Sequence, residues 1–237
     1  MSSQITTAFT QQYSNNVKLL AQEKGSQLRN TVNVESVTGK NSFFDQVGVA
    51  TAVKRTTRHA DTLQVDTPSS RRRVSLVNYE YADLIDNQDK VRTLIDPTSS
   101  YATAAAYALG RAVDDEIIAA VTGTAYTGET GSTSTTFTAG NAITEAGSDG
   151  LTLAKLRNAK QILDSNSVDP SIPRFIIVGP VAISDLLAVT QATSSDYASV
   201  KALVQGEIDT FMGFKFVLSN RLSKTGNLRK LLVYAQD

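Results

Sequence analysis

The chain has 237 residues, with 23 basic and 23 acidic side chains, no cysteine and a single histidine, His59. A net charge of zero gives no overall field that draws the protein to nucleic acid or to anionic membranes, and the lack of cysteine excludes disulfides, thiol nucleophiles and cysteine metal sites. No apolar run approaches the roughly 20 residues of a membrane span, so we expect no membrane contact, no catalytic or metal site and no cofactor.

Residues 1–50 are expected to form an amino-terminal arm and its lead-in strands. Apolar residues make one narrow face between positions 11 and 30, which predicts a short amphipathic helix. From position 31 onward the pattern alternates and includes Gly39 and Gly48, which indicates short strands joined by turns. The segment around Gly39 is not a phosphate-binding loop, because Val34 replaces the first glycine of that motif and Asn41 replaces its final hydroxyl residue.

Residues 51–78 are expected to form an extended hairpin loop. The stretch 54–73 offers few apolar side chains to bury, and positions 66–69 (DTPS) predict a turn between two extended arms. Alternation after Arg73 predicts a strand that returns to the body of the protein, with Val74, Leu76 and Tyr79 on one side.

One long helix is expected over residues 96–123, within a segment that covers residues 79–125. Asp96 is the predicted N-cap, Pro97 suits the first helical position, and Gly123 ends the pattern. Residues at three-to-four spacing predict one buried stripe: Tyr101, Ala105, Ala108, Leu109, Ala112, Val113, Ile117, Ala120 and Val121. Three charged residues of the helix lie outside this stripe: Arg111, Asp114 and Asp115. Two interpretations stay open for them, a solvated polar face or a subunit contact.

Residues 126–150 are expected to form a threonine- and glycine-rich surface loop, with a small hairpin around Phe137 as an option. Thr152 is the predicted cap of a helix whose Leu153, Leu156, Ala159 and Leu163 share one face. A buried strand over 174–178, a helix that opens at Pro180, and a strand pair joined at positions 212–213 then indicate a compact α/β lobe. This lobe, over residues 151–237, ends in a further strand, LRKLLVY.

This order of segments resembles the major capsid proteins of tailed bacteriophages with the Hong Kong 97-like fold. The resemblance is carried by TRHADT at 57–62, RRV at 72–74, ALGRAVDDEIIAA at 108–120, RFIIVGP at 174–180 and Gly213-Phe214 within a strand pair. It implies an α+β fold with an amino-terminal arm and an extended hairpin loop. It further implies a peripheral domain over residues 79–125 with a long spine helix over 98–122, and an axial α/β domain over 151–237 that ends at the start of a return strand.

The resemblance also implies a function and partners. The protein would be a structural virion subunit that forms pentamers and hexamers of an icosahedral shell around double-stranded DNA, assembled in the host cytoplasm without catalysis. A separate scaffolding protein and a portal are implied partners, and contact with packaged DNA would be non-specific. Because relatives return to the peripheral domain through a further strand, the peripheral sheet is expected to be incomplete or the chain to be a portion of a longer product.

Three alternatives remain beside this interpretation. A non-viral protein compartment of the same fold would need a cargo-binding site, which the sequence does not locate. An α/β enzyme would lack histidine pairs, cysteine and a nucleotide loop. A nucleic-acid-binding module is disfavoured by the zero net charge and by the scarcity of aromatic residues in the basic hairpin.

The charge is unevenly distributed along the chain. Residues 54–73 carry six basic side chains against two acids, and residues 79–96 carry five acids against two basic side chains. Because a protruding hairpin points away from its own body, we predict that these charges meet a neighbouring subunit and fix its register; the alternative is two solvated surfaces, where an ion pair contributes only about 0–1 kcal/mol. The candidate subunit-interface residues are Lys54, Arg55, Arg58, Arg71, Arg72, Arg73, Glu80, Asp83, Asp86, Asp89, Arg111 and Asp114.

Overall fold

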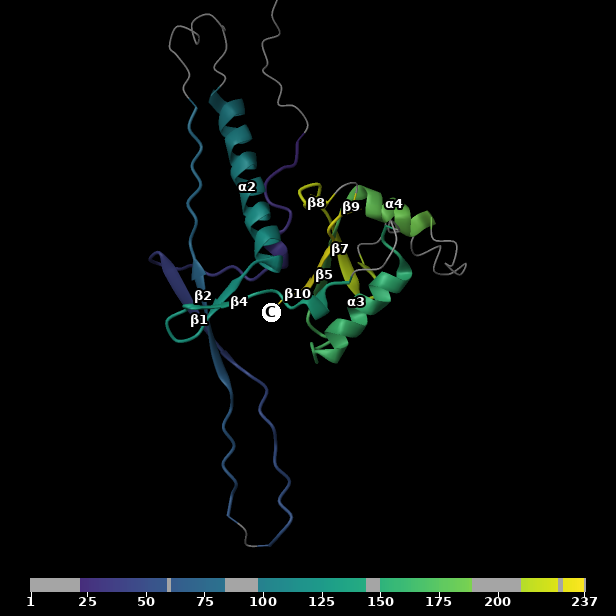
Figure 1. Ribbon diagram of the computed structural model, residues 1–237. Helices are drawn as coiled ribbons and strands as arrows, with labels where there is room; N and C mark the ends of the chain where they lie inside the picture. The colour runs from purple at the N-terminus through teal and green to yellow at the C-terminus, as the bar shows by residue number, and fades with distance from the viewer. Residues whose placement is uncertain are drawn as a thin grey trace, which may run out of the picture. The chain divides into compact units, whose positions relative to one another are not determined.

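The computed structural model describes residues 22–58, 61–83, 98–143, 150–188, 210–225 and 228–236 (Figure 1). The chain divides into two compact units, one of residues 1–26 and 79–112 and the other of residues 27–78 and 113–237. Most of the predicted amino-terminal helix, the acids Asp86 and Asp89 and the predicted cap Asp96 lie outside the described residues. The part of that helix prediction over residues 22–28 is wrong, and only a 3-10 turn, Arg29–Thr31, follows it.

Helix α2 spans Thr98–Thr122, which confirms the predicted position of the longest element. Its predicted orientation is wrong in part. Leu109 and Val113, which were expected in the buried stripe, are 40% and 38% exposed, whereas Asp114 is only 1% exposed. Asp114, which was predicted to lie outside the buried stripe, therefore lies on the buried side of the helix.

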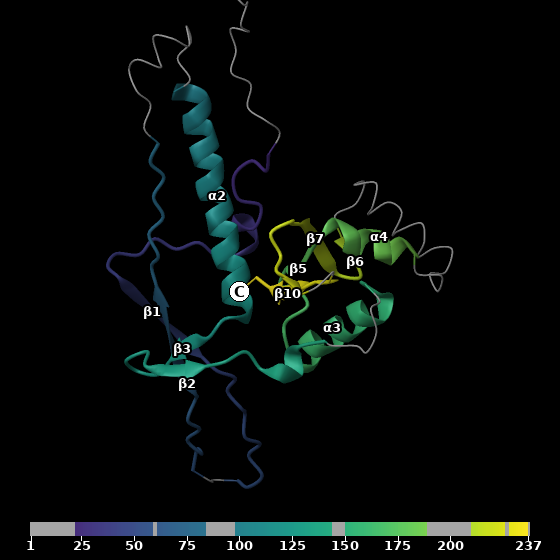
Figure 2. The ribbon, with the colours of Figure 1, turned by 45° about the horizontal axis from the view of Figure 1, so that its top comes forward.

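The first sheet is antiparallel and has four strands in the order β1 (Asn41–Val47), β2 (Ser69–Ser75), β3 (Ala125–Thr127) and β4 (Thr133–Thr135). The β1–β2 register runs from Asn41 opposite Ser75 to Val47 opposite Ser69, and the amide of Gly48 donates to the carbonyl of Pro68 at 2.7 Å. Pro68 therefore lies at the base of the hairpin, and the turn predicted at 66–69 is wrong. From there two extended segments leave the strands together, as both ribbon views show (Figures 1 and 2).

The glycine-rich segment after α2 is more ordered than predicted. β3 and β4 form a tight hairpin whose connection contains Gly128 and Gly131 at positive φ, 90° and 63°, where glycine avoids the steric cost of a side chain. This hairpin precedes Phe137 instead of surrounding it, and only a 3-10 turn, Ala139–Asn141, follows. Part of the predicted surface loop thus belongs to the first sheet.

The second sheet has the order β10 (Leu232–Ala235), β5 (Arg174–Val178), β7 (Phe214–Leu218) and β6 (Thr210–Phe211), with β5 and β7 parallel. Met212 and Gly213 join β6 to β7 with φ of 53° and 86°, the mirror-image turn that fits the twist of a hairpin. β10 pairs antiparallel with β5, so only the second part of the predicted strand LRKLLVY completes this sheet. A small ladder of β8 (Lys224–Thr225) and β9 (Leu228–Arg229) precedes it.

β5 is buried at every position because both faces of the second sheet are covered. One face packs on α3 (Leu153–Ser165) and α4 (Pro180–Ala188), and the buried set there includes Leu156, Ala159 and Phe214. The hydroxyl of Thr152 accepts from the amide of Lys155 at 3.3 Å, which confirms the predicted cap. On the other face, Ile177 and Leu232 lie with Leu28 and Leu222 against the carboxy-terminal half of α2.

Candidate assembly interface

The base of the hairpin is held by an ion pair that the sequence did not indicate. Asp45 and Arg71 face each other across β1 and β2, and the guanidinium donates to both carboxylate oxygens at 2.5 and 2.9 Å. The same guanidinium lies 5.9 Å from the ring centroid of Phe43. Hydrogen bonding to Arg71 lowers the pKa of Asp45, and the carboxylate in turn raises the pKa of Arg71. Arg71 is therefore paired within its own sheet, and the subunit contact assigned to it stays a prediction.

Arg73 is also engaged within its own sheet. Alternation along β2 places Arg71 and Arg73 on one face and Arg72 on the other. The guanidinium of Arg73 lies 4.7 Å from the ring centroid of Tyr126, a cation–π geometry, and its Nε is buried without a hydrogen-bond partner among the described residues. Gly131 allows this packing, because a Cβ there would lie 2.6 Å from the Cβ of Arg73. Of the three consecutive arginines, only Arg72 is fully exposed.

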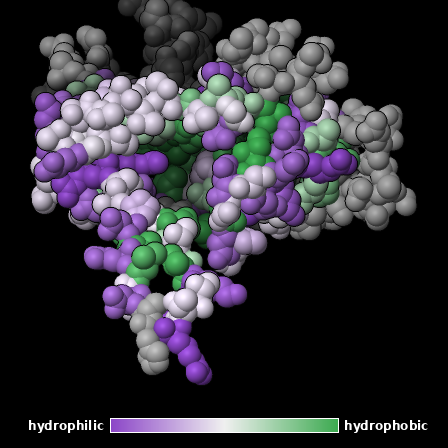
Figure 3. Space-filling view, turned by 60° about the horizontal axis from the view of Figure 1, so that its bottom comes forward, coloured by the Kyte–Doolittle hydropathy of each residue, from purple (hydrophilic) through white to green (hydrophobic). Residues whose placement is uncertain are grey.

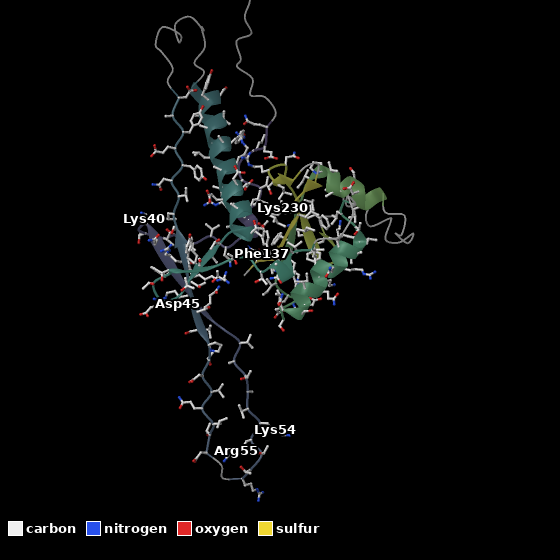
Figure 4. All side chains as sticks on the ribbon, in the orientation of Figure 1. Lys40, Asp45, Lys54, Arg55, Phe137 and Lys230 are labelled. Atoms are coloured by element: carbon white, nitrogen blue, oxygen red, sulfur yellow. The ribbon has the colours of Figure 1, made fainter. Side chains whose placement is uncertain are left out.

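Five further charged candidates, on the hairpin and just after β2, are exposed among the described residues. Lys54, Arg55 and Arg58 are exposed on the first arm of the hairpin, and Figure 4 shows Lys54 and Arg55 far along it from Asp45. Glu80 and Asp83 are exposed beyond β2, where the Tyr81 hydroxyl lies 3.5 Å from the Asp83 carboxylate. These residues keep the placement that the sequence predicted, and the subunit contact assigned to them stays a prediction.

Arg111 and Asp114 hold the amino-terminal arm. Arg111 donates to the side chain of Gln22 at 2.9 Å and to the carbonyl of Glu23 at 3.3 Å. The two carboxylate oxygens of Asp114 accept from the amides of Gln27, at 2.9 Å, and Leu28, at 3.1 Å. A solvated face is the wrong interpretation for Asp114, and its burial within the chain leaves no surface for a subunit contact.

A pair of hydroxyl groups, from the buried Thr31 and the half-buried Tyr234, lies beside this carboxylate. Thr31 donates to the Leu28 carbonyl at 2.7 Å, so the hydrogen bond between Thr31 and Tyr234 uses the tyrosine as donor. Burial raises the pKa of Tyr234, and the negative charge of Asp114 acts in the same direction, against the opposing effect of Thr31. The arm, α2 and β10 thus meet in one polar network, which no local sequence pattern indicated.

A groove lies near this network, and it is lined by residues of α2 and of the segment before β10. It encloses about 210 Å³ between the end of α2 and the segment before β10, and the Asp115–Arg221 ion pair forms part of its wall. Among the residues that the structure describes, no cluster of acidic, histidine or cysteine side chains is arranged to hold a metal ion. Within those same ranges, no helix is both long and apolar enough to cross a bilayer.

Solved capsid structures share this fold. The capsid structure of the cyanophage P-SCSP1u matches with a TM-score of 0.69 and 17% identity over 100% of this chain and 80% of that one. The cyanophage Pam1 capsid asymmetric unit matches at 0.62, with 14% identity over 92% and 74% of the two chains. The mature capsid of bacteriophage PhiM1 matches at 0.61, with 14% identity over 91% and 68%. The architecture is the Hong Kong 97-like capsid fold.

The family assignment follows from the sequence as well. The model of the phage capsid protein family matches residues 5–237, and the chain belongs to that family. No curated protein matches the chain. The protein is a structural component of the virion and not an enzyme: a major capsid protein that builds an icosahedral shell with copies of itself.

The Asp45–Arg71 pair gives a prediction for pH dependence. Because the folded-state pKa of Asp45 is lowered, the pair stabilises the hairpin base above the unfolded-state pKa, and this contribution is lost as pH falls through the lowered value. We expect Arg71→Gln to raise the Asp45 pKa in an NMR titration of the unassembled subunit. Arg72→Gln, which removes the exposed neighbour on the other face of β2, is the control and should leave the Asp45 titration in place. Equal titrations in wild type and Arg71→Gln would contradict the assigned cause.

Proposed function

We propose that the chain forms the pentamers and hexamers of a phage shell that encloses double-stranded DNA, and that its hairpin reaches a neighbouring subunit. The observation that supports the subunit contact is the exposure of the hairpin. Residues 49–58 and 61–68 are exposed at every position, although ordering each residue costs roughly 1–2 kcal/mol of backbone entropy. A segment of this kind is stabilised when a neighbour covers it.

We further propose a separate scaffolding protein and a portal as partners, with non-specific contact to the packaged DNA. The zero net charge of the chain is consistent with weak contact to a polyanion. Electron microscopy of the chain expressed alone and with candidate scaffolding proteins tests the proposal. Uniform particles with fivefold and sixfold clusters are expected only in the second case. A strictly monomeric protein under every condition would contradict shell assembly, and uniform shells from the chain alone would remove the scaffolding protein.

The charge-pairing prediction is tested with exposed residues outside β2, because Arg71 and Arg73 support their own sheet. We expect the double variant Lys54→Glu/Arg58→Glu to give a folded subunit with at least severalfold fewer shells by sedimentation at low salt. Adding Glu80→Lys and Asp83→Lys should restore part of the yield, since the charges of the proposed contact are exchanged.

The salt dependence supplies the control for this experiment. Exposed ion pairs are screened beyond about 10 Å at 0.1 M salt, so the difference between wild type and the double variant should shrink as salt increases. Undiminished shell yields from Lys54→Glu/Arg58→Glu at low salt would show that both surfaces are merely solvated.

A further inference from the structure

The chain segment that borders the groove at α2 is strongly basic. Residues 210–236 contain no acid and five basic side chains: Lys215, Arg221, Lys224, Arg229 and Lys230. Two of these, Arg221 and Lys230, line the groove itself, together with Asp115 of α2. The zero net charge of the whole chain is therefore an average that includes a local positive potential, and such a potential attracts a negatively charged partner.

The backbone register of this segment brings positive charges together. β8 and β9 pair with Lys224 opposite Arg229, and the amide of Lys230 donates to the carbonyl of Ser223 at 3.1 Å. Like charges at directly opposite positions destabilise a strand pair, and a two-stranded ladder has little stability of its own. Positions where a sequence breaks such a local rule are expected at functional sites. A negative group bound here would remove the repulsion.

The groove beside these charges is apolar at its base. Leu222 and Leu232 are 3% and 5% exposed there, and Ile118 and Ala119 line it from α2. Its volume of about 210 Å³ is below the roughly 300–1,000 Å³ of pockets for small molecules, so it suits one apolar side chain of a larger partner. Hydrophobic residues also reach the surface on the face shown in Figure 3. Apolar exposure alone therefore does not identify a docking site, and the basic rim supplies the distinction.

The two basic residues of the rim are held differently. The guanidinium of Arg221 makes a bidentate ion pair with Asp115, which fixes its position at the wall of the groove. Lys230 is exposed, and the ion pairs found within the described part of the chain do not include it. A carboxylate beside the groove can therefore pair with Lys230 while the Asp115–Arg221 pair stays intact.

We propose that this groove docks an acidic peptide segment of a partner protein. One apolar side chain of the peptide enters the groove, and its neighbouring carboxylates pair with Lys230 and with the basic β8–β9 ladder. In peptide recognition an apolar anchor commonly fills a pocket while charged groups around it select the partner. Duplex DNA shares the negative charge, but its phosphates gain nothing from an apolar groove. The inference goes beyond the proposed shell contacts, because this partner is not a copy of the chain.

Fluorescence anisotropy of the unassembled subunit tests the proposal with a labelled peptide of glutamates that has one central leucine. We expect saturable binding at low salt, which becomes at least severalfold weaker when serine replaces the leucine of the peptide. Lys230→Gln should weaken binding of the leucine peptide severalfold, because it removes the exposed cation of the rim. Lys160→Gln is the matched control, since it removes the same charge from an exposed position on α3.

A second variant tests the groove without changing any charge. Ala119 is exposed on α2 and lines the groove, so the indole of Ala119→Trp fills this space and leaves the buried core in place. We expect this variant to lose the preference for the leucine peptide over the serine peptide. Ala120→Trp, at an exposed position of the same helix outside the groove, should keep that preference.

Three results would overturn the proposal. The first is the absence of saturable binding, and the second is equal affinity of the Lys160→Gln and Lys230→Gln subunits or of the leucine and serine peptides. The third is duplex DNA that binds more tightly than the peptide, loses affinity in Lys230→Gln and is unaffected by Ala119→Trp. The basic segment would in that case be a nucleic-acid contact.

Discussion

Replacing Asp114 with alanine is expected to lower the free energy of unfolding by about 3 kcal/mol. The carboxylate accepts from the amides of Gln27 and Leu28, and Leu28 is 0% exposed, so its amide has no access to water once the acceptor is removed. A buried donor left without a partner costs about 1–3 kcal/mol, and two donors are affected here.

Urea denaturation of the unassembled subunit measures this effect. Asp114→Asn should give an intermediate loss, because an amide oxygen can serve only one of the two donors while its NH₂ group faces the other. Asp66→Ala, at an exposed position on the hairpin, is the matched control and is expected to change stability by less than about 0.5 kcal/mol. An Asp114→Ala midpoint equal to that of Asp66→Ala would show that the arm is not held by this residue.

Local signals in the sequence predicted the elements of the second sheet and its helices well. The Thr152 cap, the all-apolar run of β5 and the Met212-Gly213 turn each depend on residues that are close in the chain, and the structure confirms all three. The same is true of the length of α2, whose end is marked by Gly123. Patterns of this kind predict the local backbone conformation, because interactions between residues close in the chain largely determine it.

The orientation of α2 could not be predicted in this way. Periodicity shows which residues share a face, but α2 has small or apolar side chains on more than one side, so the pattern does not identify the buried one. Asp114 is buried because its carboxylate accepts hydrogen bonds from the backbone amides of Gln27 and Leu28. These two residues lie 87 and 86 positions earlier in the chain. A carboxylate that finds two backbone donors at that distance gives no signal in its own neighbourhood.

The pairing of β1 with β2 is the second feature that the sequence did not predict correctly, because it also depends on contacts between residues far apart in the chain. Pro68 has the sequence preferences of a turn residue, yet it lies at the base of the hairpin, because the pairing of Val47 with Ser69 fixes where the strands begin. The candidate charges divide accordingly. Lys54, Arg58, Glu80 and Asp83 are exposed as expected, whereas Arg71 meets Asp45 through a cross-strand register that only the fold defines.

Gly110 gives the second large effect, because two general rules predict opposite signs for its replacement. Alanine is favoured over glycine inside a helix by about 1 kcal/mol, so helix propensity alone predicts that Gly110→Ala stabilises the protein. A Cβ at this position, however, would lie 2.5 Å from the carbonyl carbon of Gly25, 2.6 Å from its Cα and 2.8 Å from the amide of Ser26. These are backbone atoms, which cannot rotate away as a side chain would.

We therefore expect the packing effect to prevail, with Gly110→Ala lowering the free energy of unfolding by about 1–3 kcal/mol. The arm should also be displaced from α2, so cleavage by trypsin after Lys24 should become faster in the native subunit. Gly140→Ala is the control, because a Cβ there would meet only the Thr138 methyl group at 4.0 Å. A Gly110→Ala subunit that is more stable than wild type, with unchanged cleavage after Lys24, would mean that the arm does not pass this close to the helix.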